Sequence, residues 1–390
     1  MTGLPRPLAR LIAGQVCLHA CMAGMRMAAP LLALREGYSE AAIGFLLALF
    51  ALSQVFLSLP AGRWIDRAGL RRPIAWCVVA CCAGATCAVI WPVYPVLCVS
   101  ALTTGGATGV SIIALQRHVG RVVSGATALR QVFSWLSIGP AISNFIGPFA
   151  SGLLIDHAGF RAAFLLLAVL PLVCWWWVRT TPEQPLTAAI ASAQRKGAFD
   201  LLRLPGFRRL LLVNWVLASC WDVHTFVVPV LGHERGFSAS EIGTVLGAFA
   251  VAAAAVRLLL PQLAERLREH VVITSAMAFT AVMFGVYPLM SSPLGMGVCS
   301  VLLGLALGCV QPMVMSTLHQ ITPHARHGEA VGLRLMVINA SSVAMPVLFG
   351  AAGAVLGVQA VFWCVGAVVG ASSPLALALR PGSAHHGDSP

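Results

Sequence analysis

The chain has 390 residues, of which 58% are hydrophobic and 10% charged, and its mean hydropathy of +0.86 exceeds what a soluble core needs. Lys196 is the only lysine and no Gly-rich loop ends in Gly-Lys-Ser/Thr, so the sequence contains no nucleotide-binding loop. The net charge of +12 does not indicate nucleic acid, because the arginines lie in short segments between apolar runs.

Apolar runs of about 20 residues recur from Leu8 to Leu379, the length that an α-helix needs to cross about 30 Å of hydrocarbon. They predict an all-α polytopic membrane protein with twelve transmembrane helices. The first run is too long for a signal peptide and is predicted to be an uncleaved span. In chain order we expect helices at 9–34, 40–60, 74–92, 96–116, 127–152, 160–178, 208–232, 240–260, 271–289, 294–318, 330–353 and 357–379.

The arginines are unevenly divided between the two sides of this arrangement. Only Arg35, Arg161 and Arg235 fall in the loops of one side, whereas most of the others fall on the opposite side. Because positively charged loops stay in the cytoplasm, both termini are predicted to be cytoplasmic.

An internal repeat divides the chain into two halves. The segment PLLALREGYSEAAIGFLLALF from Pro30 aligns without a gap with PVLGHERGFSASEIGTVLGAF from Pro229, at an offset of 199. A second match, between Gly147 and Met345, has an offset of 198. We expect two pseudo-symmetric six-helix bundles at 1–178 and 208–380, a cytoplasmic linker at 179–207 and a disordered tail at 381–390.

The segment after the second span, GRWIDRAGLRRP, contains the pattern Gly-x-x-x-Asp-Arg-x-Gly-x-Arg-Arg. It resembles the signature between helices 2 and 3 of the major facilitator superfamily, and the helix count and the repeat extend this resemblance over the whole chain. We expect a glycine of this pattern to open a tight turn at the end of the helix. The resemblance implies that the segment contacts a neighbouring helix and helps to hold one of two alternating states. The implied gating residues are Gly62, Asp66, Arg67, Gly69, Arg71 and Arg72, with Glu265 and Arg266 in a degenerate second copy.

The fifth span, SIGPAISNFIGPFASG, looks like a loose form of the Gly-Pro motif that drug and metabolite antiporters of this superfamily carry in helix 5. It departs from that motif because Gly147-Pro148 is followed by Gly152 alone. The fourth span also departs, since antiporter relatives often hold an arginine inside it and here Arg117 lies at its end. The resemblance implies export rather than uptake.

An arginine well inside a span, such as Arg26, is costly unless it finds water or a partner. Of the thirteen acidic residues only Asp222 lies deep in a span, and the offset of 199 places it near the depth of Arg26. We expect the two to pair across a central cavity; the alternative is a fixed ion pair or an Arg26 that reaches the outer interface. Asp222 is the predicted proton-coupling group, with His19 and His224 as alternatives because imidazole titrates near neutrality.

The first span carries two stripes, Cys17/Cys21/Met25 and His19/Met22/Arg26, on opposite faces. One metal ion cannot reach both faces, so no metal site is predicted and the thiols are interpreted as packing. Further side chains expected at the cavity, or alternatively in interhelical hydrogen bonds, are Met22, Gln131, Asn144, Trp215, Trp221, Gln311 and Asn339.

These observations predict a secondary transporter that moves a small organic molecule by alternating access, with proton-coupled export favoured. No catalytic cluster indicates an enzyme, and no cofactor is expected. Its expected partners are the substrate, protons and the lipids of a bacterial-type inner membrane, without nucleic acid, and we expect a monomer. The alternatives are proton-coupled uptake of a metabolite, transport of a soft metal such as copper, for instance through Met313, Met315 and His319, and a non-transporting receptor.

Overall fold

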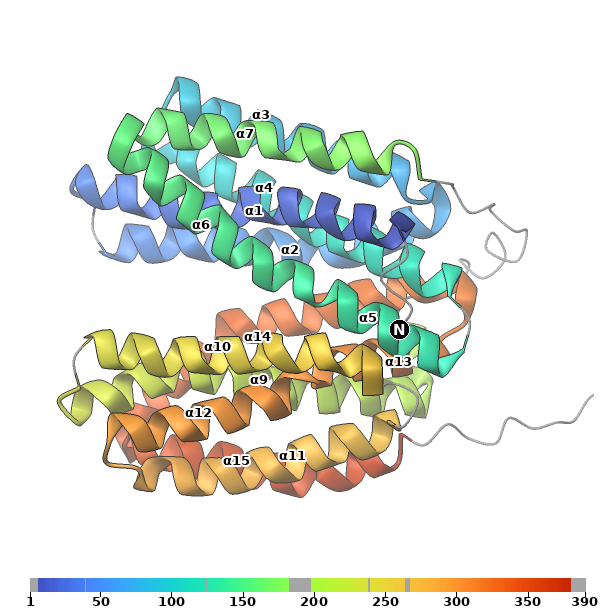
Figure 1. Cartoon of the computed structure of the whole chain (residues 1–390), viewed down its shortest axis with the longest axis vertical. Coiled ribbons are helices and arrows are strands. Elements are labelled where there is room, and N and C mark those ends of the chain that lie inside the picture. Colours follow the sequence, from blue (N-terminus) through green and yellow to red (C-terminus); the bar gives the residue numbers. More distant parts are fainter. Residues whose placement is uncertain are drawn as a thin grey trace, which may run out of the picture. The chain divides into compact units, whose positions relative to one another are not determined.

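The computed structural model describes residues 6–38, 40–123, 125–181, 198–237, 239–263 and 267–379, and its regular elements are all helices (Figure 1). The first half contains α1 (Arg6–Arg35), α2 (Glu40–Ala68), α3 (Arg71–Ile90), α4 (Tyr94–Val122), α5 (Ala126–Leu136), α6 (Ile138–Ala158) and α7 (Phe160–Val178). The second half contains η1 (Ala198–Arg203), α9 (Pro205–Glu234), α10 (Ala239–Leu263), α11 (Glu269–Val286), η2 (Tyr287–Leu289), α12 (Pro293–Gly308), α13 (Val310–Ile321), η3 (His324–Arg326), α14 (His327–Leu356) and α15 (Val358–Leu377).

The structure confirms the predicted all-α class. Within the described residues, 11 helical stretches are long and apolar enough to cross a membrane. The remaining predicted span, 330–353, lies within the 30-residue helix α14. Large apolar side chains such as Phe56, Trp76 and Val251 are mostly exposed, which suits contact with lipid.

Two predicted spans are each divided into two helices. The span 127–152 consists of α5 and α6, and the span 294–318 consists of α12 and α13. A proline lacks a backbone N–H, and its ring clashes with the carbonyl group four residues earlier. Pro140 therefore acts on Leu136, the last residue of α5, and Pro312 acts on Gly308, the last residue of α12.

The repeat of the sequence is also a repeat of contacts. On α4, a Cβ atom added to Gly105 would lie 2.5 Å from the carbonyl oxygen of Phe50 on α2. On α12, a Cβ atom at Gly304 would collide with the carbonyl oxygen of Phe249 on α10. Both residues of the second contact follow those of the first by 199 positions (304 − 105 and 249 − 50). The absence of a side chain lets the two helix backbones approach closely in each half.

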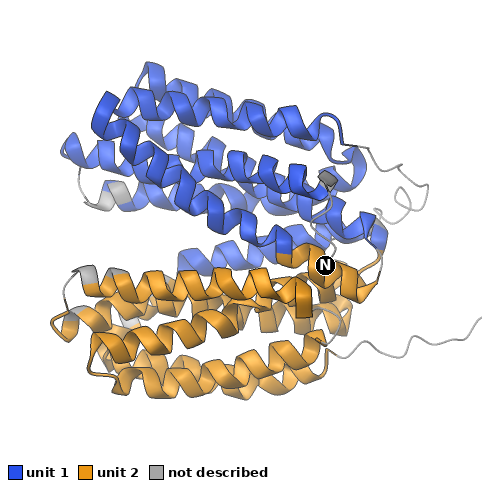
Figure 2. Cartoon of the chain, in the orientation of Figure 1, with its two compact units in different colours: residues 1–124, 135–198, 324–344 blue, residues 125–134, 199–323, 345–390 orange. Residues whose placement is uncertain are grey.

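The chain forms two compact units, shown in different colours in Figure 2. Unit 1 comprises Met1–Ser124, Trp135–Ala198 and His324–Ala344, and unit 2 comprises Gly125–Ser134, Phe199–Pro323 and Met345–Pro390. The beginning of α5 therefore belongs to unit 2, and the beginning of α14 belongs to unit 1. The division into bundles at 1–178 and 208–380 stays a prediction.

Each unit has its own helix packing. In unit 1, α1 contacts α4, α6 and α7, while α3 contacts α4 and α7 and α2 contacts α4. In unit 2, α10 contacts α12, and α15 contacts both α9 and α11. The apolar cores of the two units are completed by buried side chains such as Phe164 in unit 1 and Phe284 in unit 2.

Candidate functional site

The signature segment forms the end of α2, a short turn and the beginning of α3 rather than one loop. α2 continues to Ala68, so Gly62 and Asp66 are both helical, and the chain turns at Gly69, whose φ is 78°. The tight turn expected from a glycine of this pattern at the end of the helix is therefore at Gly69, and Gly62 is not part of it. Gly62 is required instead by a close contact within unit 1, because a Cβ atom at this position would collide with the carbonyl oxygen of Gly328.

Asp66 accepts hydrogen bonds from the beginning of α14. The backbone N–H of Gly328 donates to Oδ1 at 3.0 Å, and the N–H of Glu329 donates to Oδ2 at 3.1 Å. Both N–H groups lie in the first turn of α14, where no intrahelical acceptor exists for them. A carboxylate at this place also interacts favourably with the positive end of the helix dipole. Asp66 of one helix thus caps the N-terminus of another.

Arg117 of α4 supplies the positive charge beside this carboxylate. Its Nε donates to Asp66 Oδ1 at 3.2 Å, and its Nη2 donates to the backbone carbonyl oxygen of Asp66 at 3.1 Å. The side chains of Arg117 and Asp66 are only 2% and 1% exposed. A buried ion pair needs further hydrogen bonds to offset its loss of water, and here the two amides of α14 provide them.

Glu329 of α14 makes the reciprocal contact. Arg63 of α2 donates from Nε to Oε1 at 2.9 Å, and Arg326 donates from Nε to Oε2 at 2.7 Å. The side chain of Glu329 is 2% exposed and that of Arg63 is 43% exposed, so this pair reaches the surface. Each of the two helices therefore presents an acid that the other helix binds.

Small residues bring the two helix backbones together. A Cβ atom at Gly328 would lie 2.8 Å from Cγ of Asp66, and one at Gly332 would collide with the carbonyl oxygen of Ser58. Gly328 and Gly332 are four residues apart and so lie on one face of α14. We call Gly62, Asp66, Arg117, Gly328 and Glu329 the Asp66 cluster.

The remaining gating residues that the resemblance implies lie around this cluster or outside the described residues. Arg67 and Arg72 are exposed, and Arg71 donates from Nε to the carbonyl oxygen of Thr181 at 2.7 Å. Glu265 and Arg266 lie outside the described residues. The gating roles of all these residues stay predictions.

Unit 2 contains a second buried cluster of charged and polar groups, which we call the Glu269 cluster. Glu269 Oε1 accepts a hydrogen bond from Arg130 Nη1 of α5 at 2.9 Å. The same oxygen accepts from Ser316 Oγ at 2.8 Å and from Gln320 Nε2 at 2.7 Å, both on α13. The side chains of Arg130 and Glu269 are 7% and 9% exposed. This cluster holds the beginning of α5 against α11 and α13.

The contact between α5 and α10 is the repeat counterpart of the contact between α14 and α2. Ser134 Oγ donates to the carbonyl oxygen of Arg257 at 2.8 Å. Ser134 corresponds to Gly332 (332 − 134 = 198) and Arg257 to Ser58 (257 − 58 = 199), two residues in close approach in unit 1. One turn away, Gln131 Nε2 donates to the carbonyl oxygen of Pro261 at 3.2 Å. Gln131 therefore forms an interhelical hydrogen bond, the alternative that its sequence position left open.

The side chains predicted at the cavity are divided between the two units. In unit 1, His19 and Met22 are buried, Arg26 and Asn144 are exposed and Asn339 is half-buried. In unit 2, the half-buried side chains are Gln131, Trp215, Trp221, Asp222 and Gln311. Arg26 belongs to unit 1 and Asp222 to unit 2, so their predicted pairing stays a prediction.

His224 is enclosed within unit 2. Its Nε2 lies 2.9 Å from Ser300 Oγ, which in turn lies 2.8 Å from the hydroxyl group of Tyr287. The imidazole stacks on Phe249 with 3.9 Å between ring centroids. His224 is fully buried. This environment is that of a hydrogen-bonded core histidine.

Four charged residues of these clusters were not among the predicted site residues. Arg117, Arg130, Glu269 and Glu329 have no motif of their own in the sequence. A partial signal existed at Gly328 and Gly332, because two glycines four residues apart favour close helix contact. Nothing in the sequence indicated that α2 would be the partner.

Comparison with known proteins adds sequence relatives. A profile of the Major Facilitator Superfamily matches residues 11–298 and 210–390. The multidrug resistance protein MdtG of Yersinia enterocolitica is 25% identical over 246 residues, which are 60% of this chain and 58% of that protein. This match thus covers less than two thirds of the relative. The tetracycline resistance protein, class D, of Salmonella ordonez is 27% identical over 340 residues, 81% of this chain and 82% of that protein.

Solved structures with the same fold cover almost the whole chain. The human organic anion transporter MFSD10 has a TM-score of 0.78 at 17% identity and covers 96% of this chain and 100% of its own. A bacterial homologue of the iron transporter ferroportin, in an outward-facing state, has a TM-score of 0.77 at 17% identity and covers 96% and 98%. At these identities the likeness establishes the fold alone.

Proposed function

The chain belongs to the major facilitator superfamily, and we propose that it exports a small organic molecule in exchange for protons. Membership makes it a multi-pass membrane protein and a secondary transporter rather than an enzyme, as the sequence predicts. The direction of transport, the class of substrate and the coupling to protons are parts of the proposal.

The observation that carries the mechanism is the capping of α14 by Asp66. It joins a helix of the first half to a helix of the second half through a few charged contacts. Groups of this kind regain hydrogen bonds to water when they part, so the contact can open at moderate cost. A change of 1–3 kcal/mol in such a contact would shift the ratio of two states by about 5- to 150-fold. We propose that the Asp66 cluster is closed in one alternating state and open in the other.

Export is supported by the relatives with the printed functions of multidrug and tetracycline resistance. Proton coupling is supported by Asp222, the only acid deep in a span of the sequence. The uneven distribution of arginines supports cytoplasmic termini, which places the ends of α2 and α4 near the cytoplasmic surface.

The test uses purified protein in proteoliposomes with a pH-sensitive dye inside and an imposed proton gradient. Tetracycline and a set of amphipathic organic ions are added as probes, and the proton flux that each probe causes is measured. We expect probe-dependent flux in the wild type and its loss in Asp222→Asn. A wild type without flux for any probe, or Asp222→Asn with full flux, would contradict proton-coupled export through this residue.

The direction is tested separately in cells that produce the protein. Export predicts lower accumulation of the active probe, and lower accumulation than in cells producing Asp222→Asn. Higher accumulation in the wild type would instead identify uptake, the alternative left open by the sequence.

A further inference from the structure

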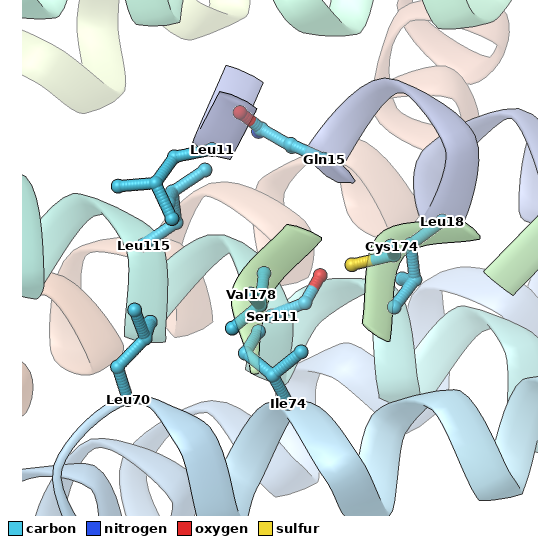
Figure 3. Close-up of a pocket in the computed structure, with 9 residues that line it drawn as sticks. All are labelled: Leu11, Gln15, Leu18, Leu70, Ile74, Ser111, Leu115, Cys174 and Val178. Carbon is cyan, nitrogen blue, oxygen red and sulfur yellow. The ribbon is translucent and has the colours of Figure 1, made fainter. Parts of the chain in front are cut away.

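An apolar groove lies between the beginnings of α10 and α12, which pack side by side in unit 2 (Figure 1). It has a volume of about 620 Å³, within the range of about 300–1,000 Å³ that is usual for ligand sites. Every described residue that lines it belongs to unit 2. The cavity of unit 1 in Figure 3 has a volume of only about 10 Å³, close to the space of one water molecule. The groove, unlike that cavity, has room for an organic ligand.

The groove exists because α10 and α12 are close together at one end and apart at the other. Toward their ends, a Cβ atom at Gly304 would collide with the carbonyl oxygen of Phe249. A Cβ atom at Gly308 would lie 2.8 Å from Cα of Ala253. Toward their beginnings, Gly297 of α12 lines the groove, and a Cβ atom added there would meet nothing within 4 Å. The two helices therefore diverge toward their beginnings and leave open space between them.

Unit 1 has larger side chains at the equivalent positions. At the offset of 199, Ala248 corresponds to Leu49 (248 − 49) and Gly297 to Cys98 (297 − 98). Leu49 is buried, so its longer side chain is part of the packing of unit 1. Ala248 and Gly297 both line the groove of unit 2. The groove thus follows from small residues in the second half and is not a requirement of the repeated helix pair.

The beginnings of the two helices are also tied together in unit 1. The hydroxyl group of Tyr94, at the beginning of α4, donates to the carbonyl oxygen of Ala42 on α2 at 2.7 Å. The counterparts in unit 2 are Pro293 (293 − 94 = 199) and Glu241 (241 − 42 = 199). Because the side chain of Pro293 has no donor, this tie cannot form between α10 and α12.

The groove lies on a face that suits contact with lipid. Leu294 and Val298 line it and are 79% and 52% exposed, although both lie in a stretch apolar enough to cross a membrane. From Pro293 to Leu302 the lining covers nine steps of α12 (302 − 293), or about 13 Å at 1.5 Å per residue. This length is close to half of the hydrocarbon thickness of about 30 Å, so the groove has the depth of one leaflet.

The polar side chains of the groove lie at one end of it. Among the described residues that line it, Glu241 and Thr244 are the polar ones, and both lie in the first turns of α10. The distribution of arginines predicts that this end lies at the outer surface of the membrane. Glu241 is exposed there, at the level of the lipid headgroups. A carboxylate at this level attracts a cationic headgroup and repels an anionic one.

We propose that the groove binds one phospholipid with a primary ammonium headgroup, phosphatidylethanolamine. One acyl chain lies between Ala248 and Gly297, and the ammonium group donates hydrogen bonds to Glu241. The bound lipid occupies the space that larger side chains fill in unit 1 and supports the beginnings of α10 and α12. This inference does not depend on the proposed export function.

The experiment uses the full-length protein in phosphatidylcholine nanodiscs that contain a small fraction of a photoactivatable lipid. The probe is phosphatidylethanolamine or phosphatidylglycerol with the same diazirine in one acyl chain. After illumination and proteolysis, adducts on the peptides that cover 241–248 and 293–302 are counted per chain. We expect at least fivefold more adducts with phosphatidylethanolamine than with phosphatidylglycerol in the wild type.

Two variants test the groove and two test its charged end. Gly297→Leu fills the groove, and Ala248→Leu restores the leucine of unit 1, so we expect each to lower labelling at least fivefold. The matched control is Gly247→Leu on α10, where an added Cβ atom meets nothing within 4 Å and the residue does not line the groove. We expect Gly247→Leu to label as the wild type does. Glu241→Gln should lose the preference for phosphatidylethanolamine, and Glu241→Asp should keep it.

The outcomes separate the two parts of the site. Labelling that persists in both Gly297→Leu and Ala248→Leu, or that falls equally in Gly247→Leu, would overturn the groove as the binding site. Equal labelling by the two probes in the wild type, or a preference that survives in Glu241→Gln, would overturn recognition of the ammonium group.

Discussion

Replacing Asp66 by asparagine tests the capping of α14 most directly. The carboxylate accepts from Gly328 N, Glu329 N and Arg117 Nε at 3.0, 3.1 and 3.2 Å. In Asp66→Asn one oxygen remains as an acceptor, but the amide nitrogen replaces the other and cannot accept a bond. At least one hydrogen bond to a charged group is lost, and Arg117 keeps a buried charge without its counter-ion. Together these losses amount to about 3 kcal/mol.

A loss of this size is measurable as amide hydrogen exchange. The amides of Gly328 and Glu329 are in the first turn of α14, so their protection in this state comes from Asp66. At 1.36 kcal/mol for each factor of ten, about 3 kcal/mol corresponds to exchange about 150-fold faster in Asp66→Asn. The assay is exchange in lipid nanodiscs, followed on a peptide that covers the beginning of α14.

The control is Asp200→Asn in η1. Asp200 lies 3.7 Å from Arg203, whose side chain is 86% exposed, so this pair contributes little. Exchange at the beginning of α14 should therefore be unchanged in Asp200→Asn. If Asp66→Asn exchanges within threefold of the wild type, the carboxylate does not hold α14 and the reasoning fails.

Three further predictions concern the contacts around these clusters. Gly62→Ala must displace Gly328, and we expect overpacking of about 1–3 kcal/mol to lower the thermal unfolding midpoint in detergent. The control is Gly44→Ala in the same helix, where an added Cβ atom meets nothing within 4 Å and the midpoint should not fall. Equal midpoints for the two variants would contradict the close contact at Gly62. Glu269→Gln leaves the buried charge of Arg130 without its partner, so we expect a loss of about 3–5 kcal/mol in the free energy of unfolding by denaturant. A loss under about 1 kcal/mol would contradict a buried pair. His224→Phe keeps the stack on Phe249 but removes one hydrogen bond, so we expect about 1 kcal/mol of destabilisation and unchanged proton flux. Loss of proton flux in a folded His224→Phe variant would instead indicate that His224 takes part in proton transfer.

The sequence predicted the helices and the repeat well, because both depend on local patterns. Apolar length located the spans, and the offset of 199 relates the contact of Gly304 with Phe249 to that of Gly105 with Phe50. The breaks after Leu136 and Gly308 were missed, although Pro140 and Pro312 encode them four residues later. The proline rule alone does not decide between a break and a continuous helix, because Pro148 and Pro171 lie inside continuous helices.

The site was predictable only in part, because its partners are far apart in the sequence. The signature pattern drew attention to Asp66, but Gly328 lies 262 positions away, and a backbone N–H has no signature of its own. Glycine serves both turns and close contacts, and only the structure shows that Gly69 makes the turn whereas Gly62 makes the close contact with Gly328. His224 was grouped with Asp222 on α9, and only the contacts with Ser300 and Phe249 show that it points into the core of unit 2.

Each of the two clusters holds the beginning of a helix, but with different chemistry, and the difference has a consequence for gating. In unit 1 the beginning of α14 donates two backbone N–H groups to Asp66, and both N–H groups point to the carboxylate only while that turn is helical. In unit 2 the beginning of α5 offers the side chain of Arg130 to Glu269, a contact that survives local fraying of the helix. The Asp66 contact therefore depends on the order of α14 as well as on its position. Fraying of one helical turn is enough to release Asp66, whereas release of Glu269 requires α5 to move away, and we expect the Asp66 cluster to open first.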